Sequence, residues 1–106
     1  MNPDVLNALA EPTRFRIVEL LREQPYSVNE IAVSLGLSQP QASKHLKYLA
    51  QAGVISVQPA AQKRIYTLNP QPFVQLDDWV RSFEKFWEHK LNNLERYLNQ
   101  SKKGEK

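Results

Sequence analysis

A segment between residues 38 and 47 carries many side chains that can donate or accept hydrogen bonds. Its polar and basic members are Ser38, Gln39, Gln41, Ser43, Lys44, His45 and Lys47. Amide and hydroxyl groups can bond the edges of nucleic-acid bases, and ammonium groups can meet phosphates or guanine acceptors. Small side chains at Ala42 and Ser43 permit a close approach. The segment therefore has the chemistry of a surface that contacts double-stranded DNA.

The charges are distributed unevenly along the chain. The net charge is +3, and no Asp or Glu occurs between Ile31 and Leu76. This acid-free span contains four basic residues, which are Lys44, Lys47, Lys63 and Arg64. Lys63 and Arg64 could also protect an edge strand from pairing with another chain. The middle of the chain is nevertheless the part best suited to contact phosphates. Gln62, which precedes Lys63 and Arg64, is predicted to contact DNA with them.

Helical spacing and capping residues predict three helices before the polar segment. The first two are expected over residues 3–10 and 13–23, separated by a proline. Ser27 is predicted to cap the third helix, with Glu30 as its capping-box partner. Gly36 is expected to end it, because a residue without Cβ can adopt the left-handed turn.

The polar segment itself is predicted to be the fourth helix, capped by Ser38 and ended by Gly53. The tight connection between the third and fourth helices fits a helix-turn-helix, whose second helix lies in the major groove of DNA. A polar helix face is more often merely solvated, but the order of the elements favours DNA contact. For His45, orienting the helix or bonding a phosphate competes with contact to a base.

The second half of the chain predicts a hairpin followed by a long helix. Residues 54–58 and 63–68 alternate in polarity and are joined by residues 59–62, which indicates two short strands. Helical spacing returns over residues 70–99, and residues 100–106 read as a flexible tail. The predicted fold class is mainly α with a small β-hairpin: a winged helix-turn-helix with a long C-terminal dimerisation helix.

Length and composition limit the other classes of function. A chain of 106 residues predicts a single domain, 1–106. Neither an 18-residue apolar run nor a secretion signal is apparent, so we expect no membrane contact and a cytoplasmic location. Without Cys, a nucleophile elbow or a glycine-rich phosphate loop, no enzyme and no cofactor are expected. The only acid pair, Asp77-Asp78, suits the dipole near a helix start.

Three stretches of the sequence resemble the ArsR/SmtB family of winged helix-turn-helix regulators. They are LAEPTRFRIVELL at residues 9–21, LGLSQPQASKHLKYLAQAGVI at residues 35–55 and KRIYTLNP at residues 63–70. The resemblance implies a homodimeric repressor on an inverted-repeat DNA operator. It also implies that Gln39, Gln41, Ser43 and Lys44 contact bases. Lys63 and Arg64 match the wing that holds the DNA backbone or minor groove.

The sequence departs from the metal-sensing members of that family. Their Cys pair in the third helix corresponds to Ser27 and Asn29, which supply no thiolates. Their second metal pattern would fall on Asp77, Trp79, Lys90 and Asn93, of which only the aspartate matches. His89 lies on a charged side of the last helix and is expected to be solvated. We therefore predict a regulator of the non-metal-sensing type, with no metal site.

The apolar positions of the first and last helices exceed what so small a body can bury. They are predicted to form a two-fold dimer interface, and the set comprises Val5, Leu6, Leu9, Phe73, Leu76, Trp79, Val80, Phe83, Phe86, Trp87, Leu91 and Leu94. A pocket for an organic effector among the large rings is a less favoured alternative. In a second function class, the chain is a protein-interaction module whose aromatic C-terminal helix docks a partner protein or antagonist.

Overall fold

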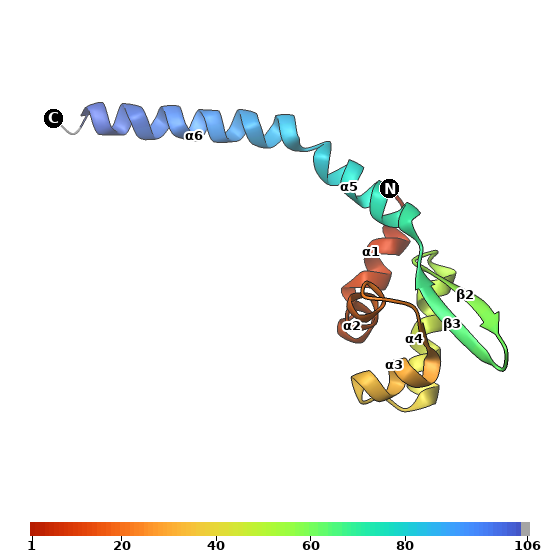
Figure 1. Ribbon diagram of the computed structural model, residues 1–106. Helices are drawn as coiled ribbons and strands as arrows, with labels where there is room; N and C mark the ends of the chain where they lie inside the picture. Colours follow the sequence, from red (N-terminus) through yellow and green to blue (C-terminus); the bar gives the residue numbers. More distant parts are fainter. Residues whose placement is uncertain (105–106) are drawn as a thin grey trace. The chain divides into compact units, whose positions relative to one another are not determined.

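The structure is a computed structural model that describes residues 1–104, with side chains described as far as Gln100. The chain divides into two compact units, Met1–Val74 and a second that begins at Gln75. Its elements in chain order (Figure 1) are α1 (Pro3–Ala10), α2 (Pro12–Leu21), β1 (Tyr26–Ser27), α3 (Val28–Leu35), α4 (Gln39–Gln51), β2 (Ile55–Ala60), β3 (Lys63–Leu68), α5 (Pro70–Arg81) and α6 (Glu84–Gly104). Among these residues, no helix combines the length and apolar composition that a membrane span requires.

The first unit encloses one hydrophobic core. Its largest fully buried side chains come from α2, α3, α4 and the residues that follow α4, namely Ile17, Ile31, Leu46, Leu49 and Val54. Leu46 and Leu49 lie on the same face of α4 as Ala42, which is also buried. This spacing leaves the opposite face of α4 in solvent. The core therefore fixes which side of the polar helix is available to a ligand.

The predicted capping box of α3 and the predicted Ser38 cap of α4 are both confirmed, and the cap of α4 is also a capping box. At α3, the backbone N–H of Ser27 donates to Glu30 Oε1 at 2.9 Å, and the backbone N–H of Glu30 donates to Ser27 Oγ at 3.2 Å. Ser38 and Gln41 form the same pair of bonds at α4, at 3.0 and 3.2 Å. Gly36, at φ 67°, ends α3 in the left-handed conformation. These local bonds set the short turn between the two helices.

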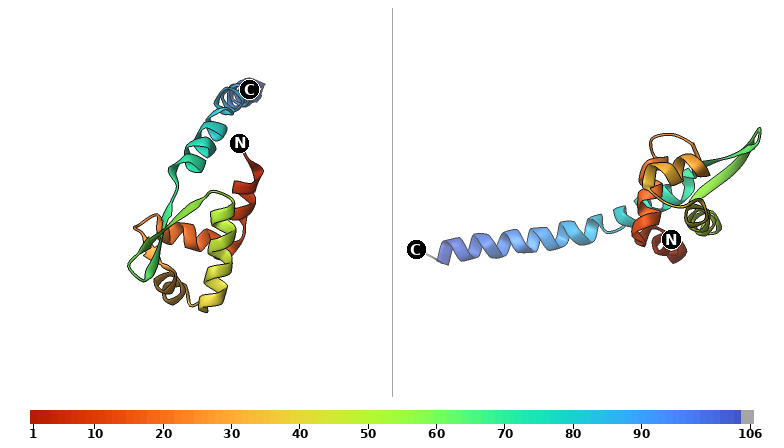
Figure 2. Two further views of the ribbon diagram at one scale, coloured as in Figure 1. Left: turned by 90° about the vertical axis from the view of Figure 1, so that its right-hand side faces the viewer. Right: turned by 90° about the horizontal axis from the view of Figure 1, so that it is seen from below.

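The sheet of the first unit has three antiparallel strands in the order β1-β3-β2, where the sequence predicted two. The additional strand β1 pairs Tyr26 with Tyr66 and Ser27 with Ile65. Two residues are too few to show an alternating pattern, so β1 could not be predicted from the sequence. Figure 2 shows β2 and β3 as a hairpin whose tip projects beyond the helices of this unit. This hairpin is the wing.

The wing is longer than predicted, because β2 continues through Pro59 to Ala60. Pro59 lies opposite Arg64 in the register. β2 is an edge strand, and no strand pairs with its outer side. A proline is tolerated at this position because the N–H that it lacks would point to that outer side. Only Ala61 and Gln62 then form the turn, and Ala61 has φ 57°, a left-handed conformation that is unusual for a residue with a side chain.

The C-terminal region, predicted as one helix over residues 70–99, is divided into α5 and α6 by a short turn at Ser82 and Phe83. The Ser82 hydroxyl donates to the carbonyl of Trp79, and the Phe83 N–H donates to the carbonyl of Val80. A serine that bonds the backbone in this way competes with the helical pattern. The predicted tail over 100–106 is helical as far as Gly104, and residues 105–106 lie outside the described part of the chain.

Candidate nucleic-acid interface

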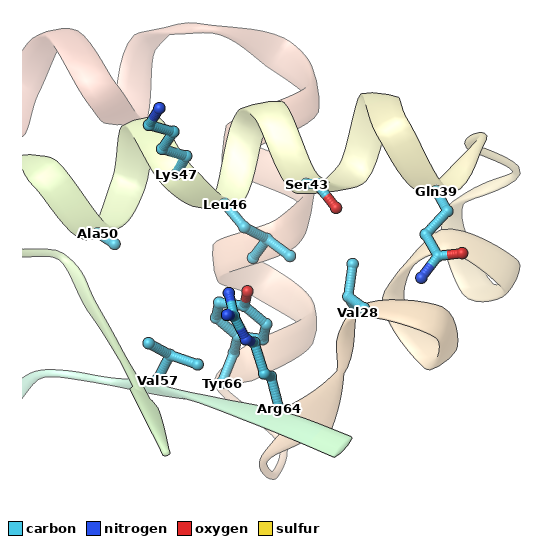
Figure 3. A pocket seen from close by; sticks show the side chains of 9 residues that line it. All are labelled: Val28, Gln39, Ser43, Leu46, Lys47, Ala50, Val57, Arg64 and Tyr66. Atoms are coloured by element: carbon cyan, nitrogen blue, oxygen red, sulfur yellow. The ribbon is translucent and has the colours of Figure 1, made fainter. Parts of the chain in front are cut away.

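The exposed face of α4 lies opposite the wing, and a cavity of about 560 Å³ separates them. Gln39, Ser43 and Lys47 line it from α4, because residues four apart share one helix face. Arg64 lines it from β3, and Figure 3 shows this side chain beside Tyr66 with its guanidinium toward α4. The apolar lining is Val28, Leu46, Ala50, Val57 and Tyr66. The fold thus brings together polar groups from two segments that are distant in the sequence.

A second cavity, of about 370 Å³, lies between the wing and the start of α3. Its lining from the wing comprises the predicted residues Gln62, Lys63 and Arg64, and Gln39 lines it from α4. The remaining lining comes from the start of α3 and the residue before it, namely Ser27, Val28, Asn29 and Glu30. Gln39 and Arg64 border both cavities, so the two form neighbouring parts of one polar surface.

Gln41 and Lys44 are exposed, as predicted, but line neither cavity. The Gln41 side-chain carbonyl accepts the N–H of Ser38, so this glutamine also stabilises the start of α4. Its amide NH₂ group takes no part in that capping box. The ammonium end of Lys47 points away from the strands in Figure 3. The predicted residues therefore present more than one direction of contact along α4.

His45 lies on a different side of α4 from the cavity-lining residues. Its Nδ1 is 3.7 Å from Glu11 Oε2, and its side chain is 22% exposed. Glu11 also accepts the backbone N–H of Arg14 at 2.8 Å, as the cap of α2. That bond is the main cause of a lowered pKa at Glu11, and the charges of His45 and Arg14 lower it further. This geometry favours the structural interpretation of His45 over contact with bases.

Arg14 is a supporting residue that the sequence analysis missed. Its Nε donates to the carbonyl of Ala8 at 2.8 Å, and its guanidinium lies 4.0 Å from the centre of the Tyr48 ring. Arg14 therefore links the end of α1 to α4 through a backbone bond and a cation–π contact. The sequence offered no local signal for this role, because Tyr48 is 34 positions further along the chain.

Asn69 fixes the base of the wing to the end of α4. Its side-chain Nδ2 donates to the carbonyl of Gly53 at 2.9 Å, and its Oδ1 bonds the hydroxyl of Ser56. Its backbone N–H donates to the carbonyl of Val54 at 2.9 Å. These contacts hold the strands that carry Arg64 against the helix that carries Gln39. The separation of the two cavity walls therefore depends on Asn69.

The positions predicted to face a second subunit fall into two groups. In the first unit, Val5 is only 4% exposed and packs in the core of the subunit, which leaves little of its side chain for a partner. Leu9 and Phe73 pack partly against the same core, whereas Leu6 is 38% exposed. An N-terminal partner surface would therefore centre on Leu6.

The second unit carries most of the remaining predicted interface. Leu76 is partly exposed in the single chain. The other predicted apolar positions are all exposed, namely Trp79, Val80, Phe83, Phe86, Trp87, Leu91 and Leu94. Phe86 and Trp87 meet edge to face, with ring centroids 5.1 Å apart. His89 Nε2 lies 3.2 Å from the side-chain amide of Asn93 in the same helix. Within the part of the chain that the structure describes, no three acidic or His side chains gather as metal ligands.

Comparisons with known proteins agree with the geometry of α3, α4 and the wing. Residues 11–57 match the family model described as bacterial regulatory protein, arsR family. The chain is 35% identical over 92 residues to the HTH-type transcriptional regulator Rv2034 of Mycobacterium tuberculosis. The aligned region covers 87% of this chain and 83% of that protein. It is 34% identical over 80 residues to the transcriptional repressor SdpR of Bacillus subtilis, spanning 76% and 89% of the two chains.

A solved structure shows the same fold. It is the homodimeric winged helix-turn-helix DNA-binding domain of Mb0332 from Mycobacterium bovis, which superimposes with a TM-score of 0.64 at 25% identity and covers 81% of each chain. The chain therefore belongs to the ArsR family of DNA-binding transcriptional regulators and is not an enzyme.

Proposed function

We propose that this regulator is a homodimeric repressor that binds an inverted-repeat operator through α4 and the wing. The observation that carries the proposal is the cavity that Gln39, Ser43 and Lys47 of α4 line together with Arg64 of β3. The repressor SdpR and the homodimeric Mb0332 domain are relatives that support the two finer parts of the proposal. A bacterial DNA-binding regulator works in the cytoplasm, where the chromosome lies.

Base contact is assigned to the first turns of α4. Gln39 can bond adenine bidentately, Gln41 can donate through its free amide NH₂ group, and Ser43 can bond either a donor or an acceptor on a base edge. Lys44 and Lys47 then contact phosphates or guanine. The wing residues Gln62, Lys63 and Arg64 hold the backbone, which fixes the register of α4 without adding sequence information.

Two subunits are required because one recognition helix covers too few base pairs to be selective. Two helices related by a two-fold axis contact half-sites about 34 Å apart, one helical turn of DNA. The exposed aromatic and leucine side chains of the second unit supply a self-complementary surface for such a pair. Leu6 of α1 adds to it.

The inducing signal is assigned to an organic ligand or a protein antagonist, and not to a metal. A signal can release the protein from DNA only if the signal has a higher affinity for the conformation that does not bind DNA. The soft ligands of metal-sensing members are replaced by Ser27 and Asn29 in this chain. The large rings at Trp79, Phe83 and Trp87 are the surface that an apolar ligand or a partner helix would contact.

The division of labour between helix and wing can be tested by fluorescence anisotropy with duplex DNA. We expect Lys63→Ala with Arg64→Ala to weaken binding to all sequences alike and to flatten its salt dependence. Gln39→Ala or Ser43→Ala should instead cost about 1–3 kcal/mol on the preferred site only. The matched control is Arg16→Ala with Arg22→Ala, which removes two exposed positive charges from α2.

Equal losses of specific and non-specific binding in both sets of variants would contradict this division. A wild-type chain that bound no duplex, even at low salt, would favour the alternative function, in which the aromatic face of α6 docks a partner protein. Phe86 and Trp87, both about half exposed, are the observation that keeps this alternative.

A further inference from the structure

We propose that Glu30 restrains DNA binding by placing a fixed carboxylate in the cavity between the wing and the start of α3. The inference rests on the proposed contact of the wing with phosphates. Glu30 is the residue immediately before the acid-free span, and the fold brings it beside Gln62, Lys63 and Arg64. Among the residues that the structure describes, it is the only acid that lines either of the two cavities.

The capping box fixes the position of this carboxylate. Glu30 Oε1 accepts the backbone N–H of Ser27 at 2.9 Å, and Ser27 Oγ accepts the backbone N–H of Glu30 at 3.2 Å. The side chain therefore cannot turn away from an approaching ligand without breaking the cap of α3. The residue nevertheless remains exposed, so its charge is presented to the cavity.

The group is ionised at neutral pH. The pKa of Glu30 is lowered first by the bond from the backbone of Ser27, then by the Ser27 hydroxyl, and also by the positive charge of Lys63. Lys63 and Glu30 line the same cavity, so a phosphate held by Lys63 would lie near this carboxylate.

The expected consequence is a weaker phosphate contribution to DNA affinity. Two like charges a few ångströms apart in water change a binding constant by about fivefold, and salt screens the effect over about 10 Å at 0.1 M. The repulsion acts on the DNA backbone and not on base edges. It should therefore weaken operator and random DNA by the same factor and leave the ratio of their affinities unchanged.

Glu30→Gln tests this role without removing the cap. A glutamine at this position can still accept the Ser27 N–H, as Gln41 does for Ser38 at the start of α4. The matched control is Glu19→Gln, which makes the same charge change on α2, where Glu19 pairs with Arg22 at 3.0 Å. Glu19 lines neither cavity.

The reciprocal variant is Asn29→Asp, which adds a carboxylate to the same cavity. Asn29 is exposed and lies in the first turn of α3, where an acidic residue favours the helix. This variant should weaken binding while keeping the fold. Thermal unfolding of each variant establishes whether the fold is retained. Of Glu30→Gln and Asn29→Asp, at least one is expected to preserve α3.

Binding is measured on a duplex that the wild-type protein selects from a random library and on a shuffled duplex of the same composition. We expect Glu30→Gln to bind both about three to ten times more tightly at low salt, with the gain shrinking at about 0.3 M salt. Asn29→Asp should bind both more weakly, and Glu19→Gln should change little.

Equal effects of Glu30→Gln and Glu19→Gln would overturn the proposal, as would a loss of binding to the selected duplex alone, which would indicate a base contact by Glu30. Equal binding of both duplexes by the wild-type protein would contradict the proposed sequence-specific repression. Tighter binding by Glu30→Gln would even then support the proposed role of Glu30. Wild-type protein that bound neither duplex would overturn both proposals.

Discussion

Glu11 shows how a single residue can serve two helices. It caps α2 through the backbone N–H of Arg14, and its carboxylate lies 3.7 Å from His45 of α4. Both interactions favour the ionised form, and the pKa of Glu11 is lowered accordingly. A lowered pKa in the folded state means that the group stabilises the fold above its unfolded pKa. The stabilisation is lost as the pH falls through the folded pKa.

We therefore predict that Glu11→Gln lowers the free energy of unfolding at neutral pH by about 0.3–1 kcal/mol, because glutamine can still accept the Arg14 N–H but lacks the negative charge that the helix N-terminus favours. The difference from wild type should shrink as the pH falls through the lowered folded pKa of Glu11, because the wild-type carboxyl then becomes neutral too. Urea unfolding at several pH values measures it. A difference that stayed constant across this range would show that the charge of Glu11 makes no contribution.

The wing is the element whose local geometry departs most from the preference of its residues. Its two-residue turn places Ala61 at φ 57°, where a residue with a Cβ is strained and glycine is not. The sequence showed that this tip lacks a glycine, but not which residue takes the strained conformation. That assignment depended on the register, which pairs Ala60 with Lys63 and leaves only two residues in the turn.

Ala61→Gly is predicted to stabilise the wing by about 0.5–1 kcal/mol, because relief of strain exceeds the added entropy of the unfolded chain. Hydrogen exchange of the β2 and β3 amides measures this local stability directly. The control is Ala60→Gly at the end of β2, where glycine should weaken the strand. If both substitutions destabilised the hairpin equally, the turn would not be strained at Ala61.

At the scale of the whole molecule, we expect formation of the proposed dimer to depend on the aromatic surface of the second unit. Trp87→Asp would bury a charge against an apolar partner at a cost of several kcal/mol, which dissociation avoids. We expect light scattering to show a monomer and operator affinity to fall. Asn92→Asp is the matched control, because helical geometry places it nearly opposite Trp87 and it adds the same charge. An intact Trp87→Asp dimer with unchanged affinity would assign the ring to a pocket or to a different partner.

The response of the assembled regulator to metals and oxidants is a further prediction. The chain has no cysteine, and its two histidines occupy different elements, His45 in α4 and His89 in α6. We therefore expect zinc, arsenite, peroxide and sulfide to leave operator affinity unchanged. An anisotropy titration with micromolar zinc measures this. Release of the operator by zinc would point to His45, His89 and Asp77 as ligands contributed across the dimer.

The sequence by itself determined the first four helices, their caps and which polar residues of α4 are exposed. Ser27 with Glu30 and Ser38 with Gln41 are local signals, because each box joins residues three apart. Apolar spacing in α4 likewise determined that Gln39, Ser43, Lys44 and Lys47 would be exposed. These features depend on contacts within one element, so neighbouring residues are sufficient to predict them.

The tertiary structure alone decided which distant residues meet. It buried Val5 in the core of the subunit, brought His45 to Glu11 and added β1 beside β3. It also brought Glu30, which the sequence assigned only to a cap, into the cavity that the wing residues line. Each of these depends on how helices and strands pack across long sequence separations. Local periodicity carries no information about such pairings, and only the packed core determines them.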